Sequence, residues 1–287
     1  MDSRTARHLY AQHRKAMAYV EIQKPDSTLG IGSAFHIGEG VFVTARHVVE
    51  GNKILQVKIT EPVGVSAREY FREVLKLDVT DEYIREHEKT MRSIHPDRPV
   101  LFKNWLRPLE IAEGPYFQED ENLDVAIFRV REIHPEAGIV KLGFHWDDWV
   151  IRGLWHLSDA IVLGYPPIPM VNEPMLIAAR AEIHAFVVPR HAIAVHFLLS
   201  AIPRGGFSGG VAIQEDGDAL GVITSSLTQD DLPEQLGFFA VLSVEAIVKC
   251  LEANGLYPEV QRTYHESVLK EALKEGLAAR KKGDSNN

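Results

Sequence analysis

Short runs of β-branched and aromatic residues recur along the whole chain, each separated from the next by glycine, proline or aspartate. Runs of this length and composition are typical of strands, and the residues between them favour tight turns. The pattern predicts an all-β barrel or sandwich rather than a parallel βαβ sheet. The expected strands are 18–22, 33–37, 41–45, 54–60, 124–130, 160–164, 175–188, 193–200, 210–213, 219–224 and 237–242.

Three stretches interrupt the strand pattern and predict helices. Residues 4–18 favour a short helix, and residues 66–94 favour two, the second with apolar residues at helical spacing. Residues 243–255 favour another, and the charged segment after it continues as a helix with one apolar face. We interpret these apolar faces as packing against the β body, although docking of a partner gives the same pattern.

Composition and charge limit the classes of partner. With 287 residues, 45% hydrophobic and 25% charged, the chain can form one sizeable domain or two lobes sharing a core. The net charge of −9 argues against nucleic acid, because phosphate binding needs clustered Lys and Arg. We expect no secretory signal and no membrane span, since no apolar stretch is long enough. Together with the single cysteine, Cys250, this predicts a cytoplasmic protein.

Ser208 lies among glycines in the segment "PRGGFSGG" (203–210), a pattern that suits nucleophilic catalysis. A serine hydroxyl needs a base to take its proton, and the oxyanion that forms needs hydrogen-bond donors. Glycines let the backbone turn tightly enough for two N–H groups to point at one place. A plain β-turn with an incidental serine explains this motif, taken alone, about equally well.

The same segment also fits G-x-S-x-G, the nucleophile elbow of α/β hydrolases. That elbow is followed by a helix, and its acid and histidine come later in the chain. Here the residues after Ser208 have the pattern of a hairpin, and the only later histidine is His265 in the charged tail. The elbow interpretation fails on both points.

The opposite order of residues is present. His47 follows the run "VFVTA", and Asp124 opens the run "DVAIFRV". His, Asp and Ser in this order match the chymotrypsin triad. Asp120 and Glu121 lie close by, but only Asp124 opens an apolar strand.

The chain resembles the trypsin-like (chymotrypsin-fold) serine peptidases, nearer the bacterial HtrA-type and cytoplasmic branch than the digestive enzymes. "GSAFHIGEGVFVTARHVV" resembles the hairpin that leads to the family's histidine, "LDVAIFRV" its acid strand, and "GGFSGG" its G-[DN]-S-G-G motif. The three segments occur in the family's order between residues 30 and 245. We expect no PDZ domain after the peptidase region.

This resemblance implies two six-stranded antiparallel β-barrels, with the histidine and aspartate on the first and the serine on the second. It implies a serine endopeptidase acting on a protein or peptide through an acyl-enzyme, without a cofactor or metal. The implied catalytic residues are His47, Asp124 and Ser208, with the N–H groups of Gly206 and Ser208 as oxyanion hole. The implied substrate-binding residues are Ile202, Ile223, Thr224 and Ser225.

The same resemblance, together with the helical stretches, gives the expected domain boundaries. We expect residues 1–150 to form the N-terminal barrel, with a helical insert at about 63–118. Residues 151–256 are expected to form the C-terminal barrel and its helix, and residues 257–287 a helical charged tail. The insert and the tail are the candidate surfaces for a regulatory partner or for self-association.

Phe207 departs from the family pattern, since digestive members carry Asp there and HtrA-like members Asn. A phenyl group cannot pair with a newly cut N-terminus, so activation of that kind is excluded, and how the loop is held stays open. A catalytically silent or partner-activated peptide-binding module on the same fold is therefore the alternative function. An esterase using the same triad is a third hypothesis. Ile202, at the base of the implied specificity pocket, argues against cleavage after Lys or Arg.

Overall fold

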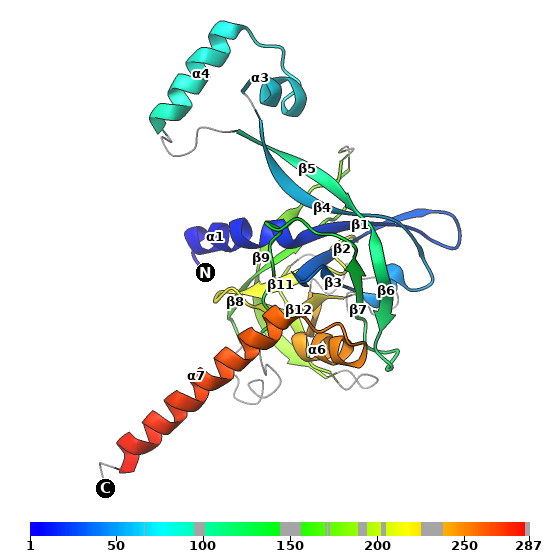
Figure 1. Ribbon diagram of the computed structural model, residues 1–287, viewed down its shortest axis with the longest axis vertical. Helices are drawn as coiled ribbons and strands as arrows, with labels where there is room; N and C mark the ends of the chain where they lie inside the picture. The colour runs from blue at the N-terminus through cyan, green and yellow to red at the C-terminus, as the bar shows by residue number, and fades with distance from the viewer. Residues whose placement is uncertain are drawn as a thin grey trace. The chain divides into compact units, whose positions relative to one another are not determined.

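The computed structural model describes residues 1–65, 67–94, 101–143, 156–169, 171, 173–188, 194–201, 205–224 and 238–284. Its strands form two antiparallel sheets (Figure 1). The first has seven strands in the order β5-β4-β1-β2-β3-β7-β6, and the second is a closed barrel in the order β10-β13-β12-β11-β8-β9. The predicted class, an all-β fold of two antiparallel lobes, is confirmed.

The first sheet consists of β1 (Met17–Gln23), β2 (Leu29–Gly38), β3 (Val41–Thr44), β4 (Lys53–Val65), β5 (Leu101–Leu109), β6 (Ile111–Phe117) and β7 (Ala126–Val130). The barrel consists of β8 (Asp159–Gly164), β9 (Ile177–Val187), β10 (His196–Leu199), β11 (Val211–Gln214), β12 (Ala219–Ile223) and β13 (Phe239–Ser243). Every strand expected from the sequence is present.

One correction concerns the insert expected to be helical over about 63–118. Helices occupy only its middle: α3 (Ala67–Glu69), the π-helix η2 (Tyr70–Val74) and α4 (Asp81–Ile94). Residues 101–117 form β5 and β6 instead, and along β6 half-buried and exposed residues alternate, which is the period of a strand. These two strands give the first sheet seven strands in place of the expected six.

The chain forms two compact units, and their boundaries differ from those of the two sheets. Residues 1–58 and 108–287 form one compact unit, and residues 59–107 form a second. Within the second unit Ala67, Phe71 and Ile84 form a small apolar cluster of their own, and the rings of Phe71 and His87 meet in a T-shaped arrangement. The barrel and strands β1, β2, β3, β6 and β7 of the first sheet therefore belong to the first unit, whereas most of β4 and β5 belongs to the second.

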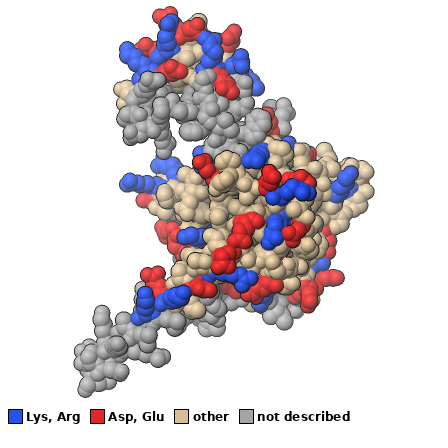
Figure 2. Space-filling view, in the orientation of Figure 1, with Lys and Arg blue, Asp and Glu red and all other residues tan. Residues whose placement is uncertain are grey.

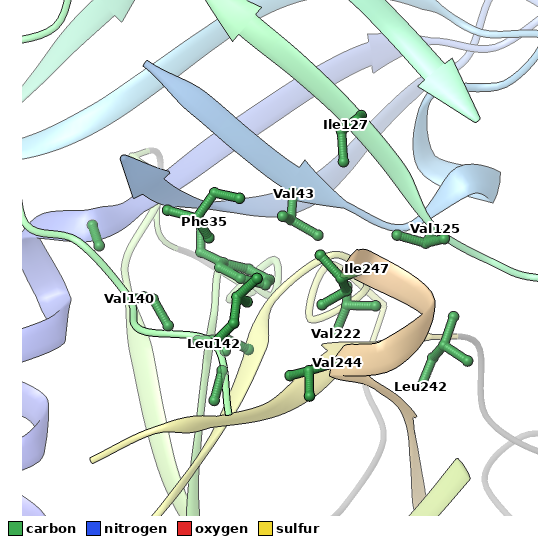
Figure 3. Packing of buried hydrophobic residues seen from close by; sticks show 14 of the residues in the cluster. Phe35, Val43, Val125, Ile127, Val140, Leu142, Val222, Leu242, Val244 and Ile247 are labelled. Carbon is green, nitrogen blue, oxygen red and sulfur yellow. The ribbon is translucent and has the colours of Figure 1, made fainter. Parts of the chain in front are cut away.

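A single apolar core joins the two sheets. Phe35 and Val43 of the first sheet and Val222 and Leu242 of the barrel belong to one cluster of buried side chains, which Ile247 also joins (Figure 3). Because both sheets contribute to this core, the side chains in it are buried only when the two lobes are packed together. Relative movement of the lobes would expose this shared surface, so the junction between them is a firm place for a site.

The remaining helices cover the body. They are α1 (Ser3–His13) with the 3₁₀ turn η1 (Arg14–Ala16), α2 (Arg46–Val49), α6 (Val244–Ala253) and α7 (Glu259–Asp284). The first turns of α7 are fixed by Gln261, whose side-chain amide donates to the carbonyls of Ile37 and Val140 and accepts from the N–H of Leu142. Helix α6 buries Cys250, as expected for a packing residue. No helix in the described ranges is long and apolar enough to cross a membrane.

Charged side chains of both signs are mixed over the described part of the face in Figure 2. The acidic excess of the chain, a net charge of −9, is therefore not gathered at one place on this face.

His13 predicts an acid-sensitive stability. It ends α1, is completely buried, and burial lowers its pKa to about 4. The unfolded chain takes up a proton near pH 6.5 but the folded protein only near pH 4, so stability falls as the pH drops through this window. We expect His13→Gln to remove about 2–3 kcal/mol of the difference in unfolding free energy between pH 7.5 and 4.5.

Urea unfolding at the two pH values measures this difference. The exposed His8 on the same helix provides the control: its charge is only a minor cause of the lowered His13 pKa, so His8→Gln should change the difference far less than His13→Gln. Equal acid sensitivity of His13→Gln and the wild-type protein would show that His13 is not the group responsible.

Candidate active site

Two neighbouring strands of the first sheet bring His47 and Asp124 together. Strand β3 pairs with β7 antiparallel, with Thr44 opposite Ala126. Residues that follow the end of β3 therefore lie beside residues that precede the start of β7. His47 lies in α2, three residues after Thr44, and Asp124 lies two residues before Ala126.

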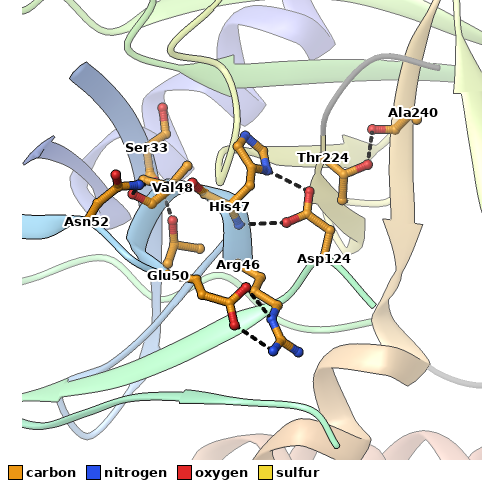
Figure 4. Close-up of polar contacts among 10 residues, drawn as sticks. Ser33, Arg46, His47, Val48, Glu50, Asn52, Asp124, Thr224 and Ala240 are labelled. Carbon is orange, nitrogen blue, oxygen red and sulfur yellow. Dashed lines mark hydrogen bonds and ion pairs between the residues drawn. The ribbon is translucent and has the colours of Figure 1, made fainter. Parts of the chain in front are cut away.

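The aspartate holds the histidine by two hydrogen bonds (Figure 4). The Asp124 carboxylate accepts from the backbone N–H of His47 at 2.9 Å and from its ring Nδ1 at 2.7 Å. A carboxylate can only accept, so Nδ1 carries a proton and the lone pair of the neutral ring is on Nε2. The His47 side chain is 44% exposed and that of Asp124 20%, so the imidazole is open to a ligand while its partner is more covered.

The alternative acids do not take this place. Asp120 accepts from the backbone and side-chain amides of Asn122, which closes a turn, and these hydrogen bonds lower its pKa. Among the acidic residues considered from the sequence, Asp124 is the one hydrogen-bonded to His47.

The short helix that carries His47 is held at both ends. Arg46 makes a two-pronged ion pair with Glu50 and stacks over the ring of Phe117. The Arg46 hydrogen bond holds the pKa of the Glu50 carboxyl below its ordinary value. The Asn52 side chain donates to the carbonyls of His47 and Val48, which have no partner inside so short a helix. These contacts restrict the imidazole to one region.

The loop that carries Ser208 comes from the barrel and touches the first sheet. Gly209 has a φ of +81°, and a Cβ there would lie 2.1 Å from the carbonyl oxygen of Ser33 and 2.3 Å from Oγ1 of Thr44. Only glycine fits this contact. The residue after Ser208 is therefore packed against the strand end that leads into His47.

Hydrogen bonds fix most peptide groups of this loop. The carbonyl of Phe207 accepts from the N–H of Gly210, and that of Ser208 accepts from the N–H of Ser33 at 2.8 Å. The N–H of Gly209 donates to the carbonyl of Ile223.

Some N–H groups of the loop donate no hydrogen bond within the described part of the chain. Among the described residues, neither the N–H of Gly206 nor the N–H of Ser208 donates a hydrogen bond. These are the two groups that the sequence predicts as oxyanion hole. Gly206 has a φ of +92°, a conformation that favours glycine.

The described residues include no hydrogen bond between Ser208 and His47. The structure therefore joins the histidine to the aspartate and packs the serine loop against the same strand end. The last contact of the predicted triad is not formed.

The predicted substrate-binding residues are only partly described. Ile202 and Ser225 lie outside the described residues. The side chains of Ile223 and Thr224 are buried in the barrel, and the backbone of Ile223 bonds to Gly209 and Gly210 of the serine loop. The structure gives Ile223 a part in holding the loop, and its contact with a substrate stays a prediction.

Phe207 shows how the loop is held where other members of the predicted family have a polar residue. Its side chain is 4% exposed and belongs to the apolar cluster of the barrel. A Cβ on Gly164 would lie 2.8 Å from its ring, so the ring fills the space above a glycine at the end of β8. The loop is anchored by apolar packing.

Sequence reasoning missed the residues that support the loop from the other lobe. Ser33 and Thr44 are completely buried, and the Thr44 hydroxyl donates to the Ser33 carbonyl at 2.7 Å. Their only signal in the sequence is that each lies within a segment resembling the family hairpin.

Comparison with known proteins agrees with this architecture. A family model described as a trypsin-like peptidase domain matches residues 32–222, well over half of the chain. The chain belongs to the trypsin-like peptidase family. No curated protein matches the sequence.

Solved structures show the same fold at low identity. The Rv3671c protease from M. tuberculosis in its active form has a TM-score of 0.54 and 18% identity, covering 88% of this chain and 86% of that one. Its inactive form has a TM-score of 0.50 and 17% identity, covering 88% and 96%. The HtrA-type protease AlgW with a tripeptide has a TM-score of 0.52 and 12% identity, covering 86% and 62%.

The apolar anchor predicts an order of stabilities at position 207 of this trypsin-like peptidase. Phe207→Leu should lower the unfolding free energy by about 1–2 kcal/mol, because it refills most of the space. Phe207→Ala should cost about 3–5 kcal/mol through the cavity it leaves. Phe207→Asp, the residue of the digestive enzymes, should cost more than alanine, since it buries a carboxylate. Chemical denaturation measures all three, and an aspartate variant as stable as the leucine variant would contradict the apolar anchor.

Proposed function

We propose that this trypsin-like peptidase is a serine endopeptidase, with Ser208 as nucleophile, His47 as general base and then general acid, and Asp124 as the group that orients the imidazole. The observation that carries the proposal is the His47–Asp124 pair standing at the strand end against which Gly209 packs. Family membership supports proteins or peptides as the substrate class.

The residues supply each step of peptide hydrolysis. Ser208 Oγ adds to the carbonyl carbon of the substrate while His47 Nε2 takes its proton, and the N–H groups of Gly206 and Ser208 stabilise the oxyanion. The C–N bond then breaks, His47 returns the proton to the leaving amine, and the acyl group stays on Ser208. A water deprotonated by His47 releases the acid product and restores the serine hydroxyl.

We expect an extended peptide to lie along the lobe junction beside the segment 221–226, whose last two residues lie outside the described ones. The tripeptide in the structure of the HtrA-type protease AlgW supports a short peptide as ligand. The motifs quoted above support a position nearer the HtrA-type enzymes than the digestive ones.

One observation favours a second candidate, a silent or partner-activated peptide-binding module. The hydrogen bond from Ser208 to His47 is missing among the described residues. For the peptidase, the serine side chain must turn toward the imidazole when substrate binds, and catalytic hydrogen bonds often tighten only in the substrate complex. If the protein is instead a peptide-binding module, either a partner turns the Ser208 side chain toward His47 or their hydrogen bond never forms.

A fluorophosphonate probe, which reacts only with an activated serine, separates the candidates. We expect the purified wild-type protein to be labelled, and Ser208→Ala and His47→Ala to lose labelling. Asp124→Asn should slow it by about 10⁴, because the imidazole then takes the wrong tautomer. The exposed Ser267 supplies a control, and Ser267→Ala should be labelled as the wild type is.

Peptide-library cleavage, read by mass spectrometry, completes the test. Cleavage that disappears in Ser208→Ala supports the endopeptidase. Labelling with turnover of simple esters alone would replace it by an esterase. A wild-type protein that binds peptides without labelling or cleavage would establish the binding module.

A further inference from the structure

Ser33 lies where the first sheet meets the Ser208 loop. It is completely buried near the middle of β2, paired with Tyr19 of β1. The residue before it, Gly32, faces α2, since a Cβ there would lie 2.4 Å from Cγ1 of Val48, the residue after His47. Ser33 itself faces the serine loop. This short piece of β2 therefore touches the element that carries the base and the element that carries the nucleophile.

The polar atoms of Ser33 make contacts that converge on the loop. Its N–H donates to the carbonyl of Ser208 at 2.8 Å, and its hydroxyl donates to the carbonyl of Gly206 at 2.6 Å. The same hydroxyl accepts from the N–H of Tyr165, just beyond β8, at 2.8 Å. One side chain thus links the first sheet, the serine loop and the barrel.

These contacts fix peptide groups that decide where the oxyanion donors point. A peptide group is planar, so holding a carbonyl also holds the N–H on its other side. The Ser33 hydroxyl fixes the peptide group between Gly206 and Phe207. This restricts the backbone of Gly206, which as a glycine could otherwise adopt many conformations. The Phe207–Ser208 group, which carries the N–H of Ser208, is held by the N–H of Gly210, and Ser33 holds the peptide group on each side of it.

We propose that Ser33 is a positioning residue for catalysis, holding the N–H donors of Gly206 and Ser208 in the arrangement that stabilises the oxyanion. The inference rests on the proposed peptidase function. It assigns to the first lobe a direct part in shaping the oxyanion hole, in addition to supplying the base and its aspartate.

A hydroxyl is the side-chain group that this position requires. It donates to one backbone group and accepts from another at the same time, in a space where Gly164 lies so close that a Cβ there would be 3.0 Å from the Ser33 oxygen. Alanine leaves the Gly206 carbonyl and the Tyr165 N–H without this partner in a buried place, so the loop must shift to satisfy them. Displacement of a catalytic group by about 1 Å can cost about 10²-fold in rate.

The test compares Ser33→Ala with Ser243→Ala. Ser243 is equally buried, and its hydroxyl bonds to Glu245, away from the serine loop. We expect Ser33→Ala to lower kcat for peptide hydrolysis and the rate of fluorophosphonate labelling by about 10–100-fold, with KM within about twofold. Loss of kcat at constant KM indicates an interaction made in the transition state. Ser243→Ala should leave both rates within about threefold, and thermal unfolding reports the stability of each variant.

The outcomes are distinguishable. Wild-type labelling with an unaffected, folded Ser33→Ala overturns the role of Ser33 and leaves the peptidase intact. Equal losses in Ser33→Ala and Ser243→Ala, or a rise in KM without a fall in kcat, also overturn it. A wild-type protein that neither labels nor cleaves removes the peptidase function and the role of Ser33 together.

A second variant applies if Ser33→Ala does not fold. Ser33→Cys keeps a weak donor at the same place, and we expect its labelling rate to fall several-fold below that of wild type. A folded Ser33→Cys that labels at the wild-type rate overturns the proposal.

Discussion

The close approach of Gly209 to the first sheet is the contact on which the rest of the site depends. A side chain of any size at this position would collide with the Ser33 carbonyl and the Thr44 hydroxyl. Without it, the loop of one lobe can lie directly against the strand end of the other. The shared apolar core makes this contact durable, because separating the lobes would expose buried surface from both. Backbone packing thus places the Ser208 loop beside the strand end that leads into His47.

Much of the site could be predicted from the sequence because the signals are local. His47 and Asp124 flank apolar runs that pair in register, and Ser208 is surrounded by glycines whose positive φ the structure confirms at Gly206 and Gly209. Ser33 could not be predicted in this way. Its partners, Gly206 and Tyr165, are 173 and 132 residues away and contribute backbone atoms, which leave no mark on residue identity.

The same distinction between local and distant information explains which strands could be predicted. Strands with continuous β-branched runs were predictable, and all of them are present. Strands β5 and β6 were missed because prolines and a glycine interrupt residues 101–117, and these residues usually end strands. The β6–β7 pairing accommodates them through shifts of register around Glu113. The sequence of an irregular segment does not by itself favour a strand. The missing information was the neighbouring strand β7, which supplies hydrogen-bond partners to β6.

The position of residues 59–107 in the chain bears on how this protein could change over evolutionary time. Residues 59–107 leave the first sheet on β4 and return on β5, and these strands are neighbours in the sheet. A segment bounded by adjacent antiparallel strands can be shortened, lengthened or exchanged while the remaining topology stays as it is. Related chains with a bare hairpin here, or with a wholly different module, could keep the same pair of His47 and Asp124 and the same Ser208 loop.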